Sequence, residues 1–105
     1  LLSVKKVLEY ISIHYREPLS VKELSGISNY SEFYFMKLFK QYTGKTAAAY
    51  LNDYRLEKAK SLLLHTDNSV TDIATEVGFN NTSYFIKKFQ ETNQISPHKF
   101  RKKMS

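Results

Sequence analysis

The reactive side chains that recur in this sequence are lysines, hydroxyls and amides. Such groups bind ligands more readily than they catalyse reactions. The sequence contains no cysteine, which excludes disulfides, thiolate zinc sites and cysteine nucleophiles. His14, His65 and His98 lie far apart, and none has a second metal ligand at helical spacing. We find no glycine-rich phosphate loop, no nucleophile elbow and no acid–base pair, so we expect no enzyme, no metal and no cofactor.

Residues 33–42 are the first candidate binding segment. In a helix that turns about 100° per residue, one apolar stripe is predicted to be buried: Phe35, Leu38, Phe39 and Tyr42. The opposite face mixes two lysines with two large apolar side chains: Phe33, Met36, Lys37 and Lys40. Apolar side chains that face away from a core indicate a partner. In a DNA major groove, Phe33 and Met36 could contact thymine methyl groups while the lysines reach guanine acceptors or phosphates.

Residues 82–90 are the second candidate segment, at an offset of 50 residues from the first. The same angles predict that Phe85 and Phe89 are buried, with Lys88 at the edge of the core. The outward face is predicted to hold Ser83, Ile86, Lys87 and Gln90, and the amino end of the helix holds Thr82, Ser83 and Tyr84. Helix-turn-helix proteins present this end to base edges. Because neither face has an arginine, we expect modest sequence discrimination from each helix.

Each segment follows a shorter motif that is also repeated. Residues 20–25, Ser-Val-Lys-Glu-Leu-Ser, recur in chemical outline at 69–74 as Ser-Val-Thr-Asp-Ile-Ala. The second connection is one residue longer and contains Gly78 and Phe79, where glycine permits the turn and phenylalanine fills the core. Two copies of a short helix, a tight turn and a second helix on a basic chain predict two helix-turn-helix readers of DNA.

Capping residues and helix breakers predict where the helices that carry these segments begin and end. Few glycines and prolines, with helical apolar spacing nearly throughout, predict an all-α fold. The predicted N-caps are Ser20, Ser31, Thr46, Ser69 and Asn80 or Asn81. The first helix is amphipathic over about 4–15 and stops at Pro18, and the last begins at Pro97. Gly44 suits the left-handed end of the third helix.

A longer helix, from Ala47 to His65, is predicted to join the two halves. Its length of about 28 Å, at about 1.5 Å per residue, is close to the roughly 34 Å of one DNA turn. We expect a first helix-turn-helix subdomain at 1–45, a linker helix at 46–65 and a second helix-turn-helix subdomain at 66–105. Two recognition helices at this spacing could enter successive major grooves of one duplex, so a monomer could do what a dimer commonly does.

Composition and charge agree with this prediction. A chain of 105 residues forms one domain, or two small subdomains that share a core. The formal net charge is +6, and after Phe79 six lysines and arginines accompany a single acid, Glu91. Such a cluster is often only a solvated face, but after a helix-turn-helix pattern it favours phosphate contact. Without a signal peptide or an apolar run of about 20 residues, we expect a cytoplasmic protein, and the start at Leu1 indicates the C-terminal part of a longer one.

The combined pattern is that of a known family. It consists of Ser31, Phe35, Phe39 and Gly44, then Tyr50-Leu51, Arg55-Leu56 and Ala59, then Ile73-Ala74, Gly78-Phe79, Tyr84-Phe85, Phe89 and Pro97. This pattern resembles the DNA-binding domain of the AraC/XylS family of bacterial transcription regulators, and it covers the chain from Val4 to Arg101. Three segments are most similar to the YesN-type two-component response regulators, in which this domain follows a receiver domain: Tyr34-Phe35, Phe39-Lys40 and residues 59–63, Ala-Lys-Ser-Leu-Leu.

The resemblance implies seven helices, with two helix-turn-helix subdomains and a connecting helix. It implies base-reading residues on the third and sixth helices, to which the helical angles add Lys40: Phe33, Met36, Lys37, Thr82, Ser83, Tyr84 and Lys87. It also implies phosphate contacts at helix amino ends, where free amides and a partial positive charge attract anions: Ser31, Thr46, Asn81, Pro97, His98 and Lys99. The basic C-terminal cluster adds Arg101 to the predicted phosphate contacts.

Two positions depart from the family pattern, and a third, which agrees with it, has two interpretations. Gln94 stands where glycine is usual, which could alter the turn into the last helix. Lys37 stands where arginine is frequent, and lysine weakens any bidentate guanine contact because its ammonium is a point charge. Arg55 stands where the family keeps an arginine, but a structural ion pair with a neighbouring acid is an alternative to a phosphate contact.

We therefore expect the DNA-binding domain of a bacterial transcription regulator, with double-stranded DNA as its partner. The resemblance further implies an activator that recruits RNA polymerase after an N-terminal domain receives a signal. The alternative is a helical protein-interaction module without DNA specificity, in which the outward Phe33 and Met36 bind a partner protein. The two differ in salt dependence, because phosphate binding loses orders of magnitude in affinity between about 50 and 200 mM salt.

Overall fold

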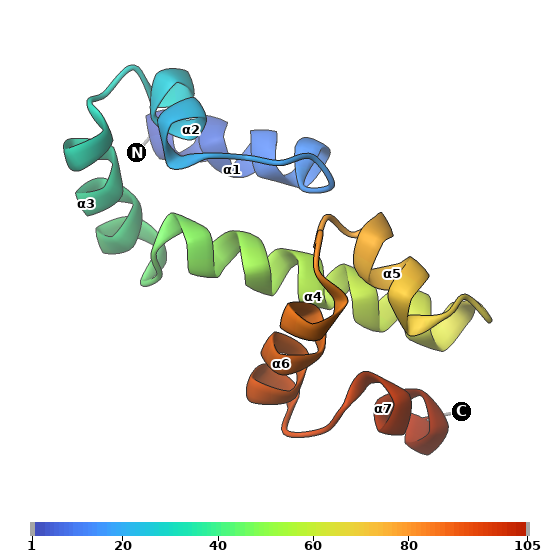
Figure 1. Cartoon of the computed structure of the whole chain (residues 1–105). Helices are drawn as coiled ribbons and strands as arrows, with labels where there is room; N and C mark the ends of the chain where they lie inside the picture. Colours follow the sequence, from blue (N-terminus) through green and yellow to red (C-terminus); the bar gives the residue numbers. More distant parts are fainter. Residues whose placement is uncertain (1, 105) are drawn as a thin grey trace. The chain divides into compact units, whose positions relative to one another are not determined.

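The structure is a computed structural model that describes residues 2–104, and these residues form only α-helices and their connections (Figure 1). The helices are α1 (Leu2–His14), α2 (Val21–Ser28), α3 (Glu32–Thr43), α4 (Ala47–His65), α5 (Val70–Glu76), α6 (Thr82–Asn93) and α7 (Pro97–Met104). The predicted all-α fold is confirmed, and α4 has the predicted bounds. Within the described residues, no helix combines the length and the apolar character needed to cross a membrane.

Short polar side chains fix the starts of the helices in the two helix-turn-helix motifs. The N-caps are Ser20 of α2, Ser31 of α3, Ser69 of α5 and Asn81 of α6. Each side chain accepts a hydrogen bond from the backbone N–H three residues later, at 3.0, 3.3, 3.0 and 2.8 Å respectively. Such a bond satisfies an amide that the helix leaves open, and its removal costs about 1 kcal/mol. The cap of α6 is thus Asn81 and not Asn80.

Backbone contacts divide the chain into two compact units, and the division falls between Asn52 and Asp53, inside α4. The first unit holds α1, α2, α3 and the start of α4. The second unit holds the rest of α4 with α5, α6 and α7. The sequence prediction treats residues 46–65 as a separate linker, whereas in the structure this helix contributes residues to both units.

The core of the first unit joins aromatic residues of α3 to aliphatic residues of α1 and α2. Phe35 and Phe39 are fully buried, and their ring centroids lie 5.6 Å apart. Phe39 also meets Tyr50 of α4 edge to face, at 5.5 Å. The buried aliphatic residues of α1 and α2 are Val4, Val7, Ile11 and Leu24. Because aromatic side chains bury the most area, this cluster holds α3 with its opposite face outward.

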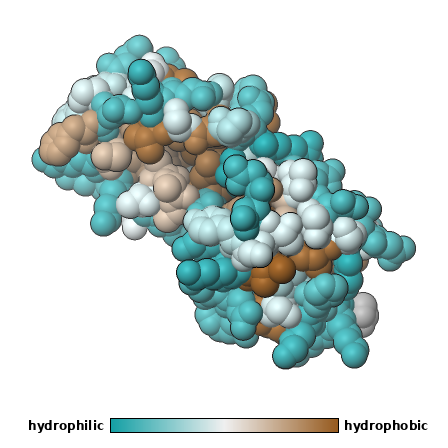
Figure 2. All heavy atoms as spheres, in the orientation of Figure 1, coloured by the Kyte–Doolittle hydropathy of each residue, from teal (hydrophilic) through white to brown (hydrophobic). Residues whose placement is uncertain are grey.

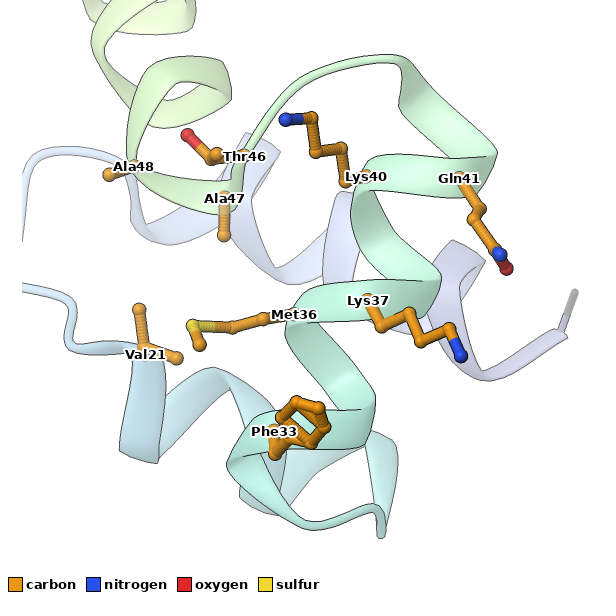
Figure 3. A pocket seen from close by; sticks show the side chains of 9 residues that line it. All are labelled: Val21, Phe33, Met36, Lys37, Lys40, Gln41, Thr46, Ala47 and Ala48. Atoms are coloured by element: carbon orange, nitrogen blue, oxygen red, sulfur yellow. The ribbon is translucent and has the colours of Figure 1, made fainter.

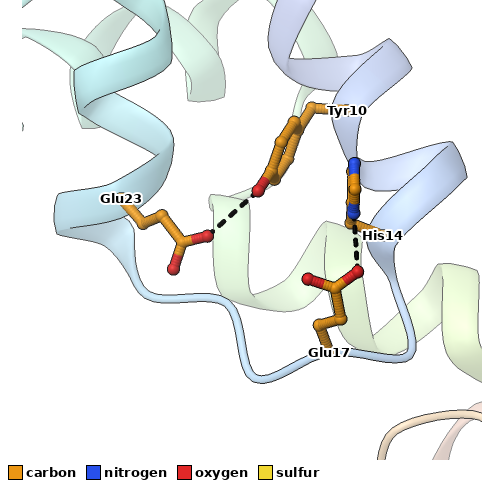
Figure 4. Close-up of polar contacts among 4 residues, drawn as sticks. All are labelled: Tyr10, His14, Glu17 and Glu23. Atoms are coloured by element: carbon orange, nitrogen blue, oxygen red, sulfur yellow. Dashed lines mark hydrogen bonds and ion pairs between the residues drawn. The ribbon is translucent and has the colours of Figure 1, made fainter.

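A polar contact joins α1 to α2 beside this core (Figure 4). The Tyr10 hydroxyl donates to Glu23 Oε2 at 3.1 Å. The Tyr10 ring also stacks on the His14 ring, with centroids 4.2 Å apart, and His14 Nδ1 lies 2.6 Å from Glu17 Oε2. These exposed contacts contribute little each. The Tyr10–Glu23 hydrogen bond joins α1 to the amino end of α2, the first helix of the helix-turn-helix motif.

The second unit repeats the aromatic packing at the 50-residue offset. Phe85 and Phe89 of α6 are fully buried with centroids 5.9 Å apart, and Phe89 meets Phe100 of α7 edge to face at 5.6 Å. Phe79 packs on Phe85 at 5.2 Å and fills the core as predicted, directly after Gly78 with its positive φ of 107°. The pattern matches that of the first unit, so the repeat seen in the sequence extends to the core.

The prediction of a buried stripe on α3 is wrong at the edges of that stripe. The sequence predicts Tyr42 in the core, but its side chain is 49% exposed, and Leu38 is only half-buried. Tyr42 lies in the last turn of α3, beyond the part of the helix where Phe35 and Phe39 are covered. The angle of a residue around a helix gives its face, whereas burial also requires a neighbour at that height along the axis.

Gln94 ends α6 in the left-handed conformation, with a φ of 62°. The equivalent residue of the first unit is Gly44, which ends α3 with a φ of 82°. A residue other than glycine loses roughly 1–2 kcal/mol of stability when its backbone adopts this conformation. Part of this difference from glycine is offset, because glycine loses more flexibility on folding. Gln94 therefore keeps the turn into the last helix intact, but its own backbone conformation is strained.

We predict that Gln94→Gly raises the free energy of unfolding by about 0.5–1 kcal/mol, because glycine relieves this strain. Urea denaturation followed by circular dichroism measures the change. Gln90→Gly, inside α6, is the control and should lower the same free energy by about 1 kcal/mol. Destabilisation by both substitutions would show that Gln94 is not strained.

Candidate nucleic-acid interface

The outward face of α3 is formed by the residues that the helical angles place there. Phe33 is 73% exposed and Met36 is 47% exposed. Lys37 and Lys40 are exposed beside them, and among residues 2–104 neither lysine side chain takes part in an ion pair. This face therefore combines two apolar side chains with two available positive charges.

A pocket of about 660 Å³ lies along this face, between α3 and the amino ends of α2 and α4 (Figure 3). Its lining consists of Phe33, Met36, Lys37, Lys40 and Gln41 of α3 with Val21, Thr46, Ala47 and Ala48 of the neighbouring helix ends. Met36 points from α3 toward Val21, while Lys37 and Gln41 point away from Val21. Sequence reasoning missed Val21, Ala47 and Ala48, although their places directly after the predicted caps Ser20 and Thr46 could have identified them.

Two predicted phosphate-binding residues of the first unit are used as N-caps. Ser31 Oγ accepts from the Tyr34 N–H at 3.3 Å, and Thr46 Oγ1 accepts from the Ala49 N–H at 3.1 Å. A hydroxyl that accepts one hydrogen bond can still donate its proton to a phosphate oxygen. The helix ends also leave further amides open, and these attract anions. Since Thr46 lines the pocket, the amino end of α4 lies beside the outward face of α3.

The outward face of α6 carries smaller and more polar side chains. Its exposed residues are Ser83, Lys87 and Gln90, at the positions that Phe33, Lys37 and Lys40 occupy in α3. Ile86 is half-buried, although the angles predict an outward position. At the amino end of α6, Thr82 is half-buried and Tyr84 is 45% exposed. Hydroxyl, amide and ammonium groups can all hydrogen-bond to base edges.

The two lysines of α6 have different surroundings. Lys88 Nζ lies 3.3 Å from Glu91 Oε1 and 5.5 Å from the centre of the Tyr84 ring. Lys87 is exposed, and within the described part of the chain its side chain has no ion pair. Lys87 is therefore the lysine of α6 that is available to a ligand, while Lys88 and Glu91 neutralise each other.

The predicted phosphate contacts of the second unit lie at the amino ends of α6 and α7. Asn81 Oδ1 caps α6 and leaves the N–H groups of its amide able to donate. Ser96 Oγ accepts from the Lys99 N–H at 3.2 Å and so caps α7, in which His98 and Lys99 are exposed. Open amides beside a lysine form an arrangement suited to phosphate.

Arg101 has a structural role that the sequence prediction does not include. Its Nε donates to the Leu63 carbonyl at 3.0 Å, and its Nη2 donates to the Thr66 carbonyl at 3.1 Å. Leu63 lies in the last turn of α4, where a helix leaves its acceptors open, and Thr66 directly follows the end of the helix. Only the remaining N–H groups of Arg101 could make the predicted phosphate contact, so we leave it out of the proposed interface.

We predict that Arg101→Met lowers the free energy of unfolding by about 1–3 kcal/mol, because two carbonyls lose charged donors. Urea denaturation measures the change. Lys103→Met, an exposed position of the same helix, should change it by less than about 0.5 kcal/mol. Normal stability combined with a strong loss of DNA affinity in Arg101→Met would instead support a phosphate contact.

Arg55 belongs to the core of the second unit. It is 8% exposed, and its guanidinium lies 5.9 Å from the centre of the Phe79 ring. Burial lowers the pKa of Arg55, but a guanidinium still keeps its proton at neutral pH. A side chain buried to this extent supports the fold, which favours a structural role over a phosphate contact.

Comparisons with known proteins agree with this geometry. The chain matches the model of a helix-turn-helix domain family over residues 24–103. It is 38% identical over 102 residues to the regulatory protein PocR of Salmonella typhimurium. That match covers 97% of this chain but 34% of PocR, so the chain spans about a third of that relative.

Solved structures of similar domains cover nearly the whole chain. The C-terminal domain of the two-component response regulator YesN from Fusobacterium nucleatum is 35% identical, with a TM-score of 0.87 over 92% of this chain and 95% of that one. The DNA-binding domain of the global transcriptional factor AdpA, solved in complex with a target DNA, is 25% identical, with a TM-score of 0.92 over 95% and 90%. The chain therefore belongs to the AraC/XylS family and is a helix-turn-helix DNA-binding domain of a transcriptional regulator.

Proposed function

We propose that α3 and α6 are the two recognition helices of this domain and that they enter successive major grooves of an operator. The observation that carries the proposal is a repeated arrangement, in which a capped helix presents an available lysine: Ser31 with Lys37, and Asn81 with Lys87. Each helix end offers open amides to a phosphate, and each lysine can reach base edges or phosphates. The solved complex of AdpA with a target DNA supports DNA as the partner.

The proposed DNA contacts fall into two sets. Phosphate contacts supply affinity and register: Ser31, Thr46, Asn81, His98 and Lys99. Base contacts supply specificity: Phe33, Met36, Lys37 and Lys40 from α3, and Thr82, Ser83, Tyr84 and Lys87 from α6. Because no arginine stands on either outward face, each helix contributes modest discrimination, and a useful operator affinity requires both helices.

We also propose that the complete protein carries an N-terminal signal-receiving domain and works in the bacterial cytoplasm. PocR is about three times as long as its match to this chain, and YesN is a two-component response regulator, so both support an additional domain. In this proposal, signal reception controls operator binding, and the bound protein activates transcription by recruiting RNA polymerase.

A selection of bound sequences from a pool of random duplexes tests the two-helix proposal. We expect two short motifs whose centres are about one helical turn, or roughly 10 base pairs, apart. Enrichment of a single motif would contradict insertion of both helices, and no enrichment at all would contradict sequence-specific binding.

Salt dependence separates this proposal from a protein-interaction module, which the exposure of Phe33 and Met36 favours as a second candidate. If the four lysines of the proposed interface, Lys37, Lys40, Lys87 and Lys99, neutralise about four phosphates, the affinity for DNA should fall on the order of 100-fold between about 50 and 200 mM salt, because binding releases counterions. Fluorescence anisotropy of a labelled duplex measures this slope. Weak duplex binding with no dependence on salt would support the protein-interaction module.

A further inference from the structure

We propose that the first unit reads thymine through its 5-methyl group, with Phe33 and Met36 as the contacting residues. The inference rests on the proposed insertion of α3 into a major groove and adds a base type and a contact mode to it. It also assigns different recognition chemistry to the two halves of the operator.

Phe33 and Met36 form an exposed apolar surface on α3. Their side chains are 73% and 47% exposed, on the same face of α3 and three residues apart. Large apolar side chains that remain adjacent in water indicate a surface that a partner covers. The partner must therefore offer apolar groups at the centre of this face.

The surrounding charges identify DNA as that partner. Lys37 and Lys40 lie beside the two apolar residues, and Thr46 brings the open amino end of α4 to the pocket. The partner must be apolar at its centre and anionic at its edges. The major groove has this combination, because thymine methyls are the apolar groups of its floor and phosphates line both sides.

The dimensions of the face agree with contacts to neighbouring thymines. Phe33 and Met36 are separated by about 4.5 Å along the helix axis, which is near the roughly 3.4 Å rise between stacked base pairs. The pocket of about 660 Å³ leaves room for base edges beside them. Met36 reaches toward Val21, and Ala47 and Ala48 extend the apolar lining (Figure 3). Two adjacent methyl groups can therefore be covered at once.

The second unit provides an internal comparison. Its residue at the position of Phe33 is Ser83, and at the position of Met36 it has Ile86, which is half-buried. The face of α6 thus offers a hydroxyl where α3 offers an aromatic ring. We expect methyl recognition in the half-site of the first unit and polar recognition in the other.

The test uses a duplex obtained by the selection described above. The thymines of one half-site at a time are replaced by deoxyuridine, which lacks only the methyl group, and affinity is measured by anisotropy at fixed salt. Binding should weaken roughly fourfold for each contacted methyl, or on the order of 15-fold for two. The change should occur in one half-site, with less than about a twofold change in the other.

Two variants assign the effect to α3. Phe33→Ser gives α3 the residue that α6 carries at the equivalent position, and the high exposure of Phe33 makes misfolding unexpected. This variant should reduce the deoxyuridine effect from the order of 15-fold to roughly fourfold, because Met36 still covers one methyl group. Lys87→Ala, in the other unit, is the matched control. It should weaken binding to both duplexes and leave their ratio unchanged.

The outcomes separate this inference from the proposed function. Equal affinity of the unmodified protein for both duplexes overturns thymine reading but leaves DNA recognition in place. An undiminished deoxyuridine effect in Phe33→Ser also overturns it, because the methyl groups would then act elsewhere. Failure to bind any duplex overturns the proposed function itself, and Phe33 and Met36 would then serve a protein partner.

Discussion

Replacing Lys37 and Lys87 together by alanine should weaken specific DNA binding roughly 30- to 1,000-fold. Each lysine is exposed at an equivalent position of a proposed recognition helix, and each contact is expected to contribute about 1–2 kcal/mol. The residues lie in separate units and have no shared partner, so their effects should add. Fluorescence anisotropy with the selected duplex at fixed salt measures the loss, and each single variant should give about half of the free-energy change.

Lys5→Ala is the matched control for this experiment. Lys5 is an exposed lysine of α1, outside both helix-turn-helix motifs, and its replacement removes the same charge. We expect a loss of less than about threefold, from the change in net charge alone. Equal losses for Lys5, Lys37 and Lys87 would show that the reading faces lie elsewhere on the molecule.

Phe89→Ala should lower the free energy of unfolding by about 3–5 kcal/mol, because it leaves a cavity in the core of the second unit. Phe89 is fully buried and lies 5.9 Å from Phe85 and 5.6 Å from Phe100, measured between ring centroids. The loss is a large share of the roughly 5–15 kcal/mol that stabilises a typical domain. Urea denaturation measures it, and weaker operator binding should accompany it because Phe89 holds α6 in place.

Phe33→Ala deletes the same side chain from the surface and is the control for this prediction. Phe33 is 73% exposed, so its removal should change the free energy of unfolding by less than about 0.5 kcal/mol. Similar destabilisation by the two substitutions would mean that burial of Phe89 is not what holds α6. The two phenylalanines thus separate a residue that builds the fold from one that is available to a partner.

The starts and ends of the helices could be predicted because their causes are local. Ser31 satisfies an amide three residues away, and Gly44 adopts a conformation that glycine alone adopts readily. The outward positions of Phe33 and Lys37 followed from the helical period, since the opposite stripe is apolar. These features need only the chemistry of one turn of helix.

Features that depend on distant segments could not be predicted in this way. The hydrogen bond from Arg101 to the Leu63 carbonyl joins residues 38 positions apart. The exposure of Tyr42 depends on where the neighbouring helices stop, and the second side of the pocket depends on Val21 approaching α3. A helical period assigns a face to each residue, but it does not say which element lies opposite.

The aromatic pairs that close each unit connect residues near one another along the chain. Phe39 meets Tyr50 across a single turn, and Phe89 meets Phe100 in the same way. Helical proteins rich in such short-range contacts fold within microseconds to milliseconds, since little loop-closure entropy is lost before contacts form. Ribosomes add only about 5–20 residues per second. We therefore expect each unit to fold soon after it leaves the ribosome, so its aromatic side chains are exposed to water only briefly.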